Sequence, residues 1–167
     1  MTNYICINGK KAELTEEQLK ALGIELPKAS PFNRADENEC AYYIEYYGEV
    51  REIIESTVEN YTCSELHDVA NYCTDKSIME QRALHETLNR LLWRYSMEHD
   101  GDKINWDDPN STKWFIYYNH NLGCFCAHNK WDYEYLGTVP FRMMETAEAA
   151  ITEIVKPFMK AHPEFKW

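Results

Sequence analysis

The fold of this chain depends on the stretch Leu84-His85-Glu86-Thr87-Leu88-Asn89-Arg90-Leu91-Leu92-Trp93-Arg94-Tyr95. Apolar residues recur in it at helical spacing and form one continuous stripe, which predicts a long amphipathic helix that packs on one face. We expect Thr74 or Ser77 to cap the start of this helix and Gly101 to end it. The stripe consists of Leu84, Leu88, Leu91, Leu92 and Tyr95.

Strand-like segments lie on both sides of this helix, in an order that repeats. Residues 41–46, 49–54 and 69–72 precede the helix, and residues 113–118, 124–127 and 138–141 precede a second apolar stripe that ends near Pro157. Tyr42-Tyr43-Ile44 aligns with Trp114-Phe115-Ile116 in this comparison. The order predicts an α+β fold of two similar antiparallel β-β-β-α units packed together. Convergence on a common hairpin pattern is the alternative to a true duplication.

The N-terminal residues predict a small separate element. Asn8-Gly9 is a strong hairpin signal, and Thr15-Glu16-Glu17-Gln18 is a capping box at a helix start. We therefore expect a β-hairpin and helix appendage over residues 1–26, a linker over 27–40 and an α+β domain over 41–167. The two repeats within that domain would span 41–100 and 111–161.

Charge and composition exclude several classes of protein. The 167 residues carry a net charge of −11, which opposes direct binding to nucleic acid or anionic membranes. No apolar stretch is long enough to span a bilayer, and no signal peptide is recognisable. We expect a cytoplasmic protein, with its six cysteines reduced. Its oligomeric state stays open.

Reactive side chains are scattered. The nearest approach to a metal site combines Cys124, Cys126, His120 and His128, but structural zinc sites space their paired cysteines more widely than C-x-C. The chain has no glycine-rich phosphate loop and no Gly-x-Ser-x-Gly motif. The sequence therefore predicts no metal site, no cofactor and no catalytic residue, and hence a protein that is not an enzyme.

Aromatic and acidic side chains suggest a binding surface instead. Exposed tyrosine and tryptophan are enriched where proteins contact one another, and an acidic surface can dock on a basic groove. We predict that a partner is bound by Asp100, Asp102, Trp106, Asp107, Asp108, Tyr46, Tyr47 and Tyr117.

Several segments resemble accessory proteins of phages and prophages of Gram-positive gut bacteria. They are Asn71-Tyr72-Cys73-Thr74-Asp75, the helix from Arg82 to Tyr95, Asp100-Gly101-Asp102-Lys103-Ile104, Lys113-Trp114-Phe115-Ile116-Tyr117-Tyr118 and Glu153-Ile154-Val155-Lys156-Pro157-Phe158. The likeness spans about residues 40–167 and the hairpin-like start. Such proteins include anti-CRISPR proteins, although no functional residue carries over.

Together these features predict a non-enzymatic phage or prophage protein that binds and inhibits a host defence factor, such as a nucleic-acid-binding CRISPR effector. Two alternatives stay open. One is a structural or regulatory phage accessory domain that binds a phage protein or itself. The other is a protein that binds a small ligand, such as a nucleotide signal, in a cleft between the repeats.

Overall fold

The structure of the chain is a computed structural model that describes residues 4–7, 10–23, 30–56, 61–99, 101–108, 110–130 and 137–167. Helices and strands are both present, as the predicted α+β class requires. The predicted Asn8-Gly9 turn and Asp100 lie outside the described residues. Within the described ranges, no helix combines the length and apolar character needed to cross a bilayer.

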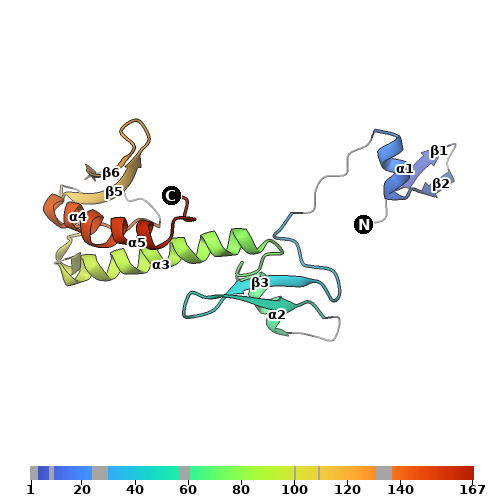
Figure 1. The fold of residues 1–167 in the computed structure, drawn as a ribbon, viewed down its shortest axis with the longest axis horizontal. Helices are drawn as coiled ribbons and strands as arrows, with labels where there is room; N and C mark the ends of the chain where they lie inside the picture. The colour runs from blue at the N-terminus through green and yellow to red at the C-terminus, as the bar shows by residue number, and fades with distance from the viewer. Residues whose placement is uncertain are drawn as a thin grey trace.

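The N-terminal element is a two-stranded ribbon and a short helix. β1 (Tyr4–Ile7) pairs antiparallel with β2 (Lys10–Glu13), and α1 (Glu16–Ala21) follows. The capping box is confirmed: the Thr15 backbone N–H donates to Gln18 Oε1 at 2.9 Å, and the Gln18 N–H donates to Thr15 Oγ1 at 3.3 Å. Figure 1 shows this element set apart from the other helices and strands.

The first hairpin unit follows. β3 (Cys40–Ile44) pairs antiparallel with β4 (Val50–Ile54), and Gly48 turns the chain between them with a φ of +89°. Helix α2 (Tyr61–Asp68), which was not predicted from the sequence, comes next. Its residue Cys63 is buried with Ala41 of β3 and with Tyr72 in one small apolar cluster. This tertiary contact stabilises a helix of only eight residues, which is too short to be stable alone.

The third strand predicted in this unit, over residues 69–72, is wrong. No residue of this segment is in a strand, and the chain makes only an isolated antiparallel bridge one residue later, between Tyr42 and Cys73. Asn71 explains why, because its side chain takes the place of a strand backbone: Asn71 Nδ2 donates to the Ile44 carbonyl at 2.8 Å, and the Ile44 N–H donates to Asn71 Oδ1 at 3.0 Å. The residue before it, Ala70, has a φ of +55°, which no extended strand adopts.

The predicted linker over residues 27–40 needs a correction as well. Its second half is attached to the first hairpin unit: the Thr74 N–H donates to the Pro31 carbonyl at 2.8 Å, and the Ala35 N–H donates to Tyr72 Oη at 3.0 Å. Strand β3 also begins within the predicted linker, at Cys40. Residues 30–40 therefore belong to the folded unit.

The long helix is α3 (Lys76–Glu98), and its apolar stripe packs as predicted. The predicted caps were both wrong by a residue or two: Asp75 is the N-cap, and the C-cap is His99, not Gly101. Asp75 Oδ1 accepts hydrogen bonds from the Ser77 N–H at 2.9 Å and from Ser77 Oγ at 2.7 Å. These hydrogen bonds lower the pKa of the Asp75 carboxyl.

Replacing Asp75 with alanine should lower the free energy of unfolding by about 1 kcal/mol, the usual value for a lost N-cap. Because the folded-state pKa of Asp75 is lowered, its contribution is complete above the unfolded pKa and is lost as pH falls through the folded pKa. Urea denaturation at pH 7 and at pH 3 measures both effects. An Asp75→Ala variant that is as stable as the wild type at pH 7 would contradict the assignment of the cap.

The second hairpin unit contains β5 (Lys113–Asn119) and β6 (Cys124–Lys130), which pair antiparallel after a 3₁₀ turn (Gly101–Lys103). The third predicted strand, 138–141, is again a single bridge, here between Trp114 and Phe141. Next to this bridge, the Pro140 carbonyl accepts a hydrogen bond from Ser96 Oγ of α3 at 2.6 Å.

One helical run closes the chain. It consists of α4 (Met144–Ala150), a π-helical turn (Ile151–Val155) and α5 (Lys156–Ala161). The predicted interruption near Pro157 takes the form of this wider turn, because proline offers no N–H to the helix ladder at that point. The tail packs back on the body, as expected: Phe165 is buried, and the rings of Trp167 and Phe125 meet edge to face.

Helix α3 joins the two units (Figure 1). Met79 and Ala83, near its N-terminal end, pack with Ile44 and Cys73 of the first unit. Leu88, Leu92 and Tyr95, further along, belong to a larger apolar core with α4, α5 and the inner face of the β5–β6 hairpin. Each hairpin thus covers a different half of the same helix.

Candidate functional site

Two tyrosines form the tip of the β3–β4 hairpin. Tyr46 and Tyr47 are 76% and 73% exposed, and their ring centroids lie 3.9 Å apart. A hydrogen bond to Tyr47 raises the pKa of the Tyr46 hydroxyl. The two rings therefore present one apolar surface with hydroxyl groups at its edge, a combination common at protein interfaces.

The residues around this tip hold it in one conformation. The Gly48 N–H donates to the Glu45 carbonyl at 2.7 Å, and the Glu45 N–H donates to the Glu49 carbonyl at 2.8 Å. Arg51 pairs with both of these glutamates, through Nε to Glu45 at 3.1 Å and through Nη2 to Glu49 at 2.8 Å. Because the turn is already ordered, binding through the two rings costs little backbone entropy.

The predicted acidic segment lies in the second unit. Asp102 and Asp107 are exposed and Asp108 is half-buried, whereas Asp100 lies outside the described residues. Trp106 lies over the buried ammonium of Lys113, whose Nζ is 5.4 Å from the ring centroid. This cation–π contact orients the indole ring, which is about half exposed.

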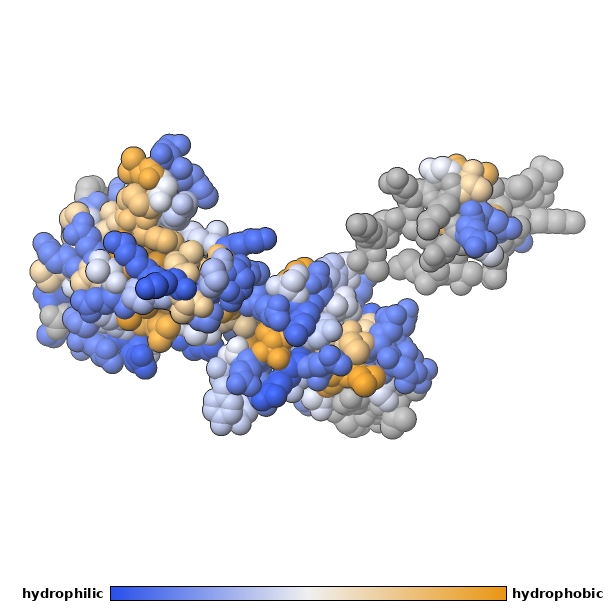
Figure 2. Space-filling model, in the orientation of Figure 1, coloured by the Kyte–Doolittle hydropathy of each residue, from blue (hydrophilic) through white to orange (hydrophobic). Residues whose placement is uncertain are grey.

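The structure does not bring the predicted partner-binding residues into one surface. Tyr46 and Tyr47 are at the tip of the β3–β4 hairpin, while Trp106 and Tyr117 belong to the unit that packs on the other half of α3 (Figure 1). Figure 2 shows a mainly hydrophilic face with smaller apolar patches on both hairpin units. The tyrosine tip is the better-defined contact site of the two.

The four predicted metal-ligand candidates lie on different faces of the β5–β6 hairpin. Cys124 and Cys126 share one face with His128, because side chains alternate along a strand. Their sulfurs are 3.8 Å apart, and the hydrogen bond between them raises the pKa of the Cys124 thiol. His120 instead meets Tyr118 edge to face, with ring centroids 5.1 Å apart, on the side that also holds Phe125.

This separation argues against the four-residue zinc site considered from the sequence. In the part of the chain that the structure describes, no group of three or more histidine, cysteine, aspartate or glutamate residues could hold a metal ion. Of the four candidates, the thiols of Cys124 and Cys126 are the two that lie close together on one face of β6.

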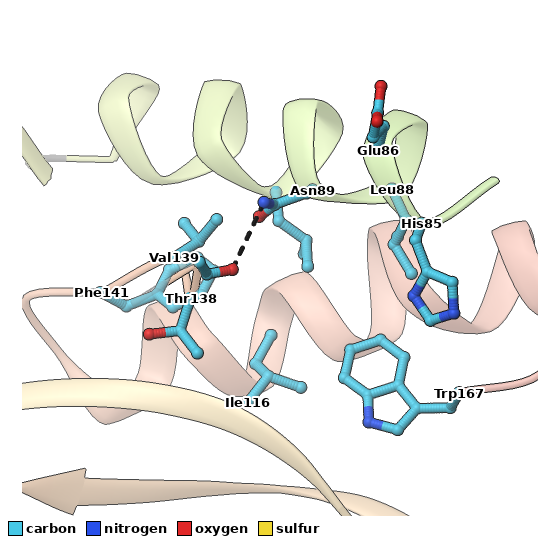
Figure 3. Close-up of a pocket in the computed structure, with 11 residues that line it drawn as sticks. His85, Glu86, Leu88, Asn89, Ile116, Thr138, Val139, Phe141 and Trp167 are labelled. Carbon is cyan, nitrogen blue, oxygen red and sulfur yellow. Dashed lines mark hydrogen bonds between the residues drawn. The ribbon is translucent and has the colours of Figure 1, made fainter. Parts of the chain in front are cut away.

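A pocket of about 280 Å³ lies between α3, the inner face of β5 and the C-terminal tail (Figure 3). Figure 3 shows the imidazole of His85 and the indole of Trp167 at one end of it, and Asn89 and Val139 toward the other. Asn89 Nδ2 donates to the Gly137 carbonyl at 3.4 Å. The apolar walls come from Leu88, Leu92, Ile116, Val139 and Phe141.

This pocket was not predicted from the sequence, although one sign of it was present there. His85 and Asn89 are four residues apart, so they lie on one face of the predicted helix. The contributions from Ile116, Val139 and Trp167 could not be seen, because tertiary packing alone brings them to that face. Apolar walls with a few polar groups are typical of sites that hold a small planar molecule or a partner's side chain.

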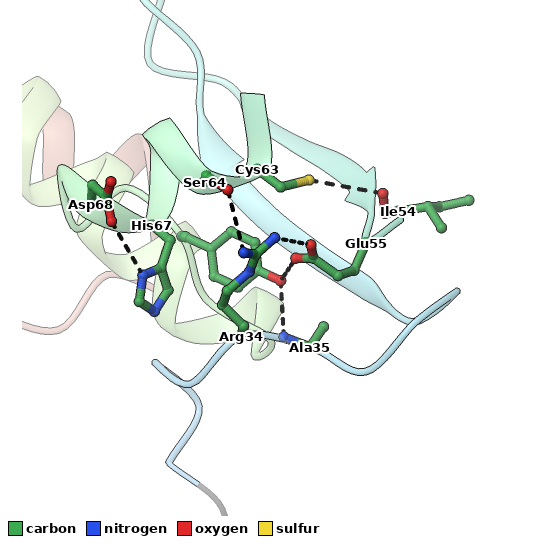
Figure 4. Close-up of polar contacts among 9 residues, drawn as sticks. Arg34, Ala35, Ile54, Glu55, Cys63, Ser64, His67 and Asp68 are labelled. Atoms are coloured by element: carbon green, nitrogen blue, oxygen red, sulfur yellow. Dashed lines mark hydrogen bonds and ion pairs between the residues drawn. The ribbon is translucent and has the colours of Figure 1, made fainter. Parts of the chain in front are cut away.

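A buried polar network stabilises the first unit (Figure 4). Glu55 is 5% exposed, pairs with Arg34 and accepts a hydrogen bond from Tyr72 Oη at 2.7 Å. Burial by itself would raise the pKa of Glu55, but the hydrogen bonds from Arg34 and Tyr72 lower it below its ordinary value. The network joins three segments that are distant in sequence, so no local pattern could predict it. Its partners satisfy one another, which is typical of a structural role.

Comparison with known protein families, with curated proteins and with solved structures gives no match for this chain.

Proposed function

We propose that this protein acts by binding another protein, and that its partner is a basic, nucleic-acid-handling factor of host defence, such as a CRISPR effector, which it inhibits without catalysis. The observation that carries this proposal is the exposed Tyr46–Tyr47 pair on an ordered hairpin tip. The net charge of −11 favours a partner of opposite charge, because complementary fields speed association and reject other partners.

The direct test is an inhibition assay with purified components. A guide-loaded CRISPR effector is incubated with the protein, and cleavage of a target DNA is measured together with complex formation. We expect a stoichiometric complex and loss of cleavage. Raising the salt concentration from about 0.1 M to about 0.5 M should weaken the complex, because the screening length of about 10 Å at 0.1 M becomes shorter. Absence of binding across representative effector types would contradict the proposed partner class.

Replacing both Tyr46 and Tyr47 with alanine should weaken this complex by about 30-fold or more. One interface hot spot contributes about 2 kcal/mol or more, which is about 30-fold at about 1.4 kcal/mol for each tenfold change in affinity, and the effects of two contacting hot spots are not additive. Titration of the partner with wild type and variant, by calorimetry or biolayer interferometry, gives the ratio.

The matched control is Leu122→Ala, which removes an exposed apolar side chain from the turn of the other hairpin. It should leave the affinity unchanged. If the control variant weakens binding as much as the double tyrosine variant does, the contact site is not the β3–β4 tip. This conclusion holds even if the wild-type protein inhibits the effector.

The pocket supports a second candidate function, the binding of a small planar ligand such as a nucleotide signal. Its volume of about 280 Å³ is close to the lower end of known ligand sites. Native mass spectrometry of the protein, followed by analysis of the denatured sample, would reveal a retained metabolite. A bound ligand that is lost in Asn89→Ala would favour this function over the first.

We also propose that the two hairpin units are copies of one ancestral unit, which consists of a two-stranded hairpin, a bridge to its first strand and a helix. In each unit an early residue of the first strand, Tyr42 or Trp114, bridges a residue that lies three positions before a helix begins. Those bridge partners are Cys73, before α3 at Lys76, and Phe141, before α4 at Met144. Superposition of the two units in an experimental structure would test the proposal. If the two hairpins were unrelated, their backbone paths would diverge after the bridge.

A further inference from the structure

We propose that Cys124 and Cys126 form a two-thiolate site for a single soft divalent cation, Zn²⁺ or Cd²⁺, on the exposed end of the β5–β6 hairpin. The site is independent of the protein-binding function proposed above. It differs from the four-residue site considered from the sequence, because His120 takes no part in it. Water would complete the coordination, since the two thiols lie at the molecular surface.

The distance between the two sulfurs carries the proposal. Zn–S bonds of about 2.3 Å at the tetrahedral angle place two sulfur ligands about 3.8 Å apart. The Sγ atoms of Cys124 and Cys126 are 3.8 Å apart in the structure. The pair therefore has the spacing of one edge of a tetrahedral thiolate site, and binding needs no rearrangement of the hairpin.

The strand geometry favours a metal over a disulfide. Two residues apart along an extended strand, Cα atoms are separated by about 6.6–6.8 Å, at the long end of the range that disulfides adopt. A direct S–S bond would shorten the sulfur separation to about 2 Å and would strain strand β6, which is paired with β5 along its whole length. A bridging cation avoids this strain.

Neighbouring groups leave the site open. Cys124 is exposed and lies opposite Asn119 in the strand pairing, while Cys126 lies opposite Tyr117. The next residue on the same face, His128, meets the Tyr117 ring edge to face at 6.1 Å between centroids. Cys126 Sγ also donates to the Cys124 carbonyl at 4.0 Å, and the charge of Lys156 acts on the Cys124 thiol. Both thiol protons must leave when a cation binds.

Loss of those protons makes binding depend on pH. A thiol must deprotonate to ligate a metal, so cation and proton compete for the sulfur. Affinity should therefore increase between pH 6 and pH 8, and a pH-independent affinity would contradict thiolate ligation.

The test is a Cd²⁺ titration of the full chain under a reductant that contains no thiol. Thiolate-to-metal charge-transfer absorption in the ultraviolet reports ligation by sulfur, and competition with a chromophoric chelator gives the affinity and the stoichiometry. We expect one equivalent bound through two sulfurs. Cys124→Ser and Cys126→Ser should each weaken binding by at least about tenfold, since even loss of an outer-shell partner costs 10- to 100-fold.

Two control variants make the test specific. Cys40→Ser removes another exposed thiol, on β3, and His120→Ala removes the candidate on the opposite face of the hairpin. Both should bind Cd²⁺ like the wild type, and circular dichroism of all four variants checks that they are folded. The proposal is overturned if the wild type binds no more tightly than Cys124→Ser, or if Cys40→Ser or His120→Ala weakens binding as much as the hairpin cysteine variants do.

Discussion

Replacing Phe141 with alanine is expected to lower the free energy of unfolding by about 3–5 kcal/mol, the usual cost of truncating a buried phenylalanine. The Phe141 side chain is 1% exposed and packs in the larger core, which also contains Leu88, Leu92 and Val155. Because α3, α4 and the β5–β6 hairpin all contribute to this core, a cavity there cannot close by moving one element alone.

Urea denaturation followed by circular dichroism measures this effect. The backbone bridge of Phe141 to Trp114, with hydrogen bonds of 2.8 Å in both directions, is retained in the variant, so the change reports the side chain. Leu122→Ala, at an exposed position, is the control and should change stability by less than about 0.5 kcal/mol. Similar losses in the two variants would mean that Phe141 is not part of a packed core.

The second large effect is expected at high pH and comes from Tyr72. Burial, together with the hydrogen bond to the Glu55 carboxylate, raises the pKa of Tyr72 to about 12. A tyrosine in the unfolded chain has a pKa of about 10. The protonated hydroxyl therefore stabilises the fold fully below pH 10, and this contribution is lost as pH rises from 10 toward 12. At about 1.36 kcal/mol for each pKa unit, the loss amounts to about 2–3 kcal/mol.

Tyr72→Phe isolates this contribution from those of the other tyrosines. At neutral pH the variant should be less stable by about 1–3 kcal/mol, because the Ala35 N–H and the Glu55 carboxylate each lose a hydrogen-bond partner. Between pH 10 and pH 12 the two proteins should converge, since only the wild type loses the Tyr72 contribution. Parallel stability profiles across that range would show that the hydroxyl of Tyr72 is not buried in the network.

Some predictions from the sequence failed for reasons that are physical and local to particular residues. The two third strands were predicted from strand-forming residues, yet each segment contributes at most one bridge, and in the first unit the side chain of Asn71 takes the place of a strand backbone. The linker was predicted from its prolines and polar residues. Its attachment depends on contacts of Pro31 and Ala35 with residues about 40 positions away, which no local pattern records.

Some features of the candidate sites could be recognised in the sequence, and others only in the tertiary structure. The exposure of the tyrosine pair follows from a turn that Gly48 makes recognisable in the sequence. The pocket beside His85 could not be recognised in the sequence, because its walls come from a helix, a strand, a loop and the C-terminal tail. The two cysteines could be placed on one strand face from their spacing, whereas the opposite placement of His120 follows from its contact with Tyr118 beyond the end of β5.

The sequence by itself determined the elements whose signals are short in range: the stripe of α3, the paired strands of each hairpin and the capping box at Thr15. Helical periodicity and strand alternation express hydrophobic burial over neighbouring residues, so one segment is enough to show them. Only the tertiary structure decided that both hairpins share α3 and that Arg34 and Tyr72 hydrogen-bond the buried Glu55 carboxylate. It also decided that the tyrosine tip and the acidic segment lie apart. Those arrangements depend on packing between distant segments, whose free energy appears in no single stretch of the chain.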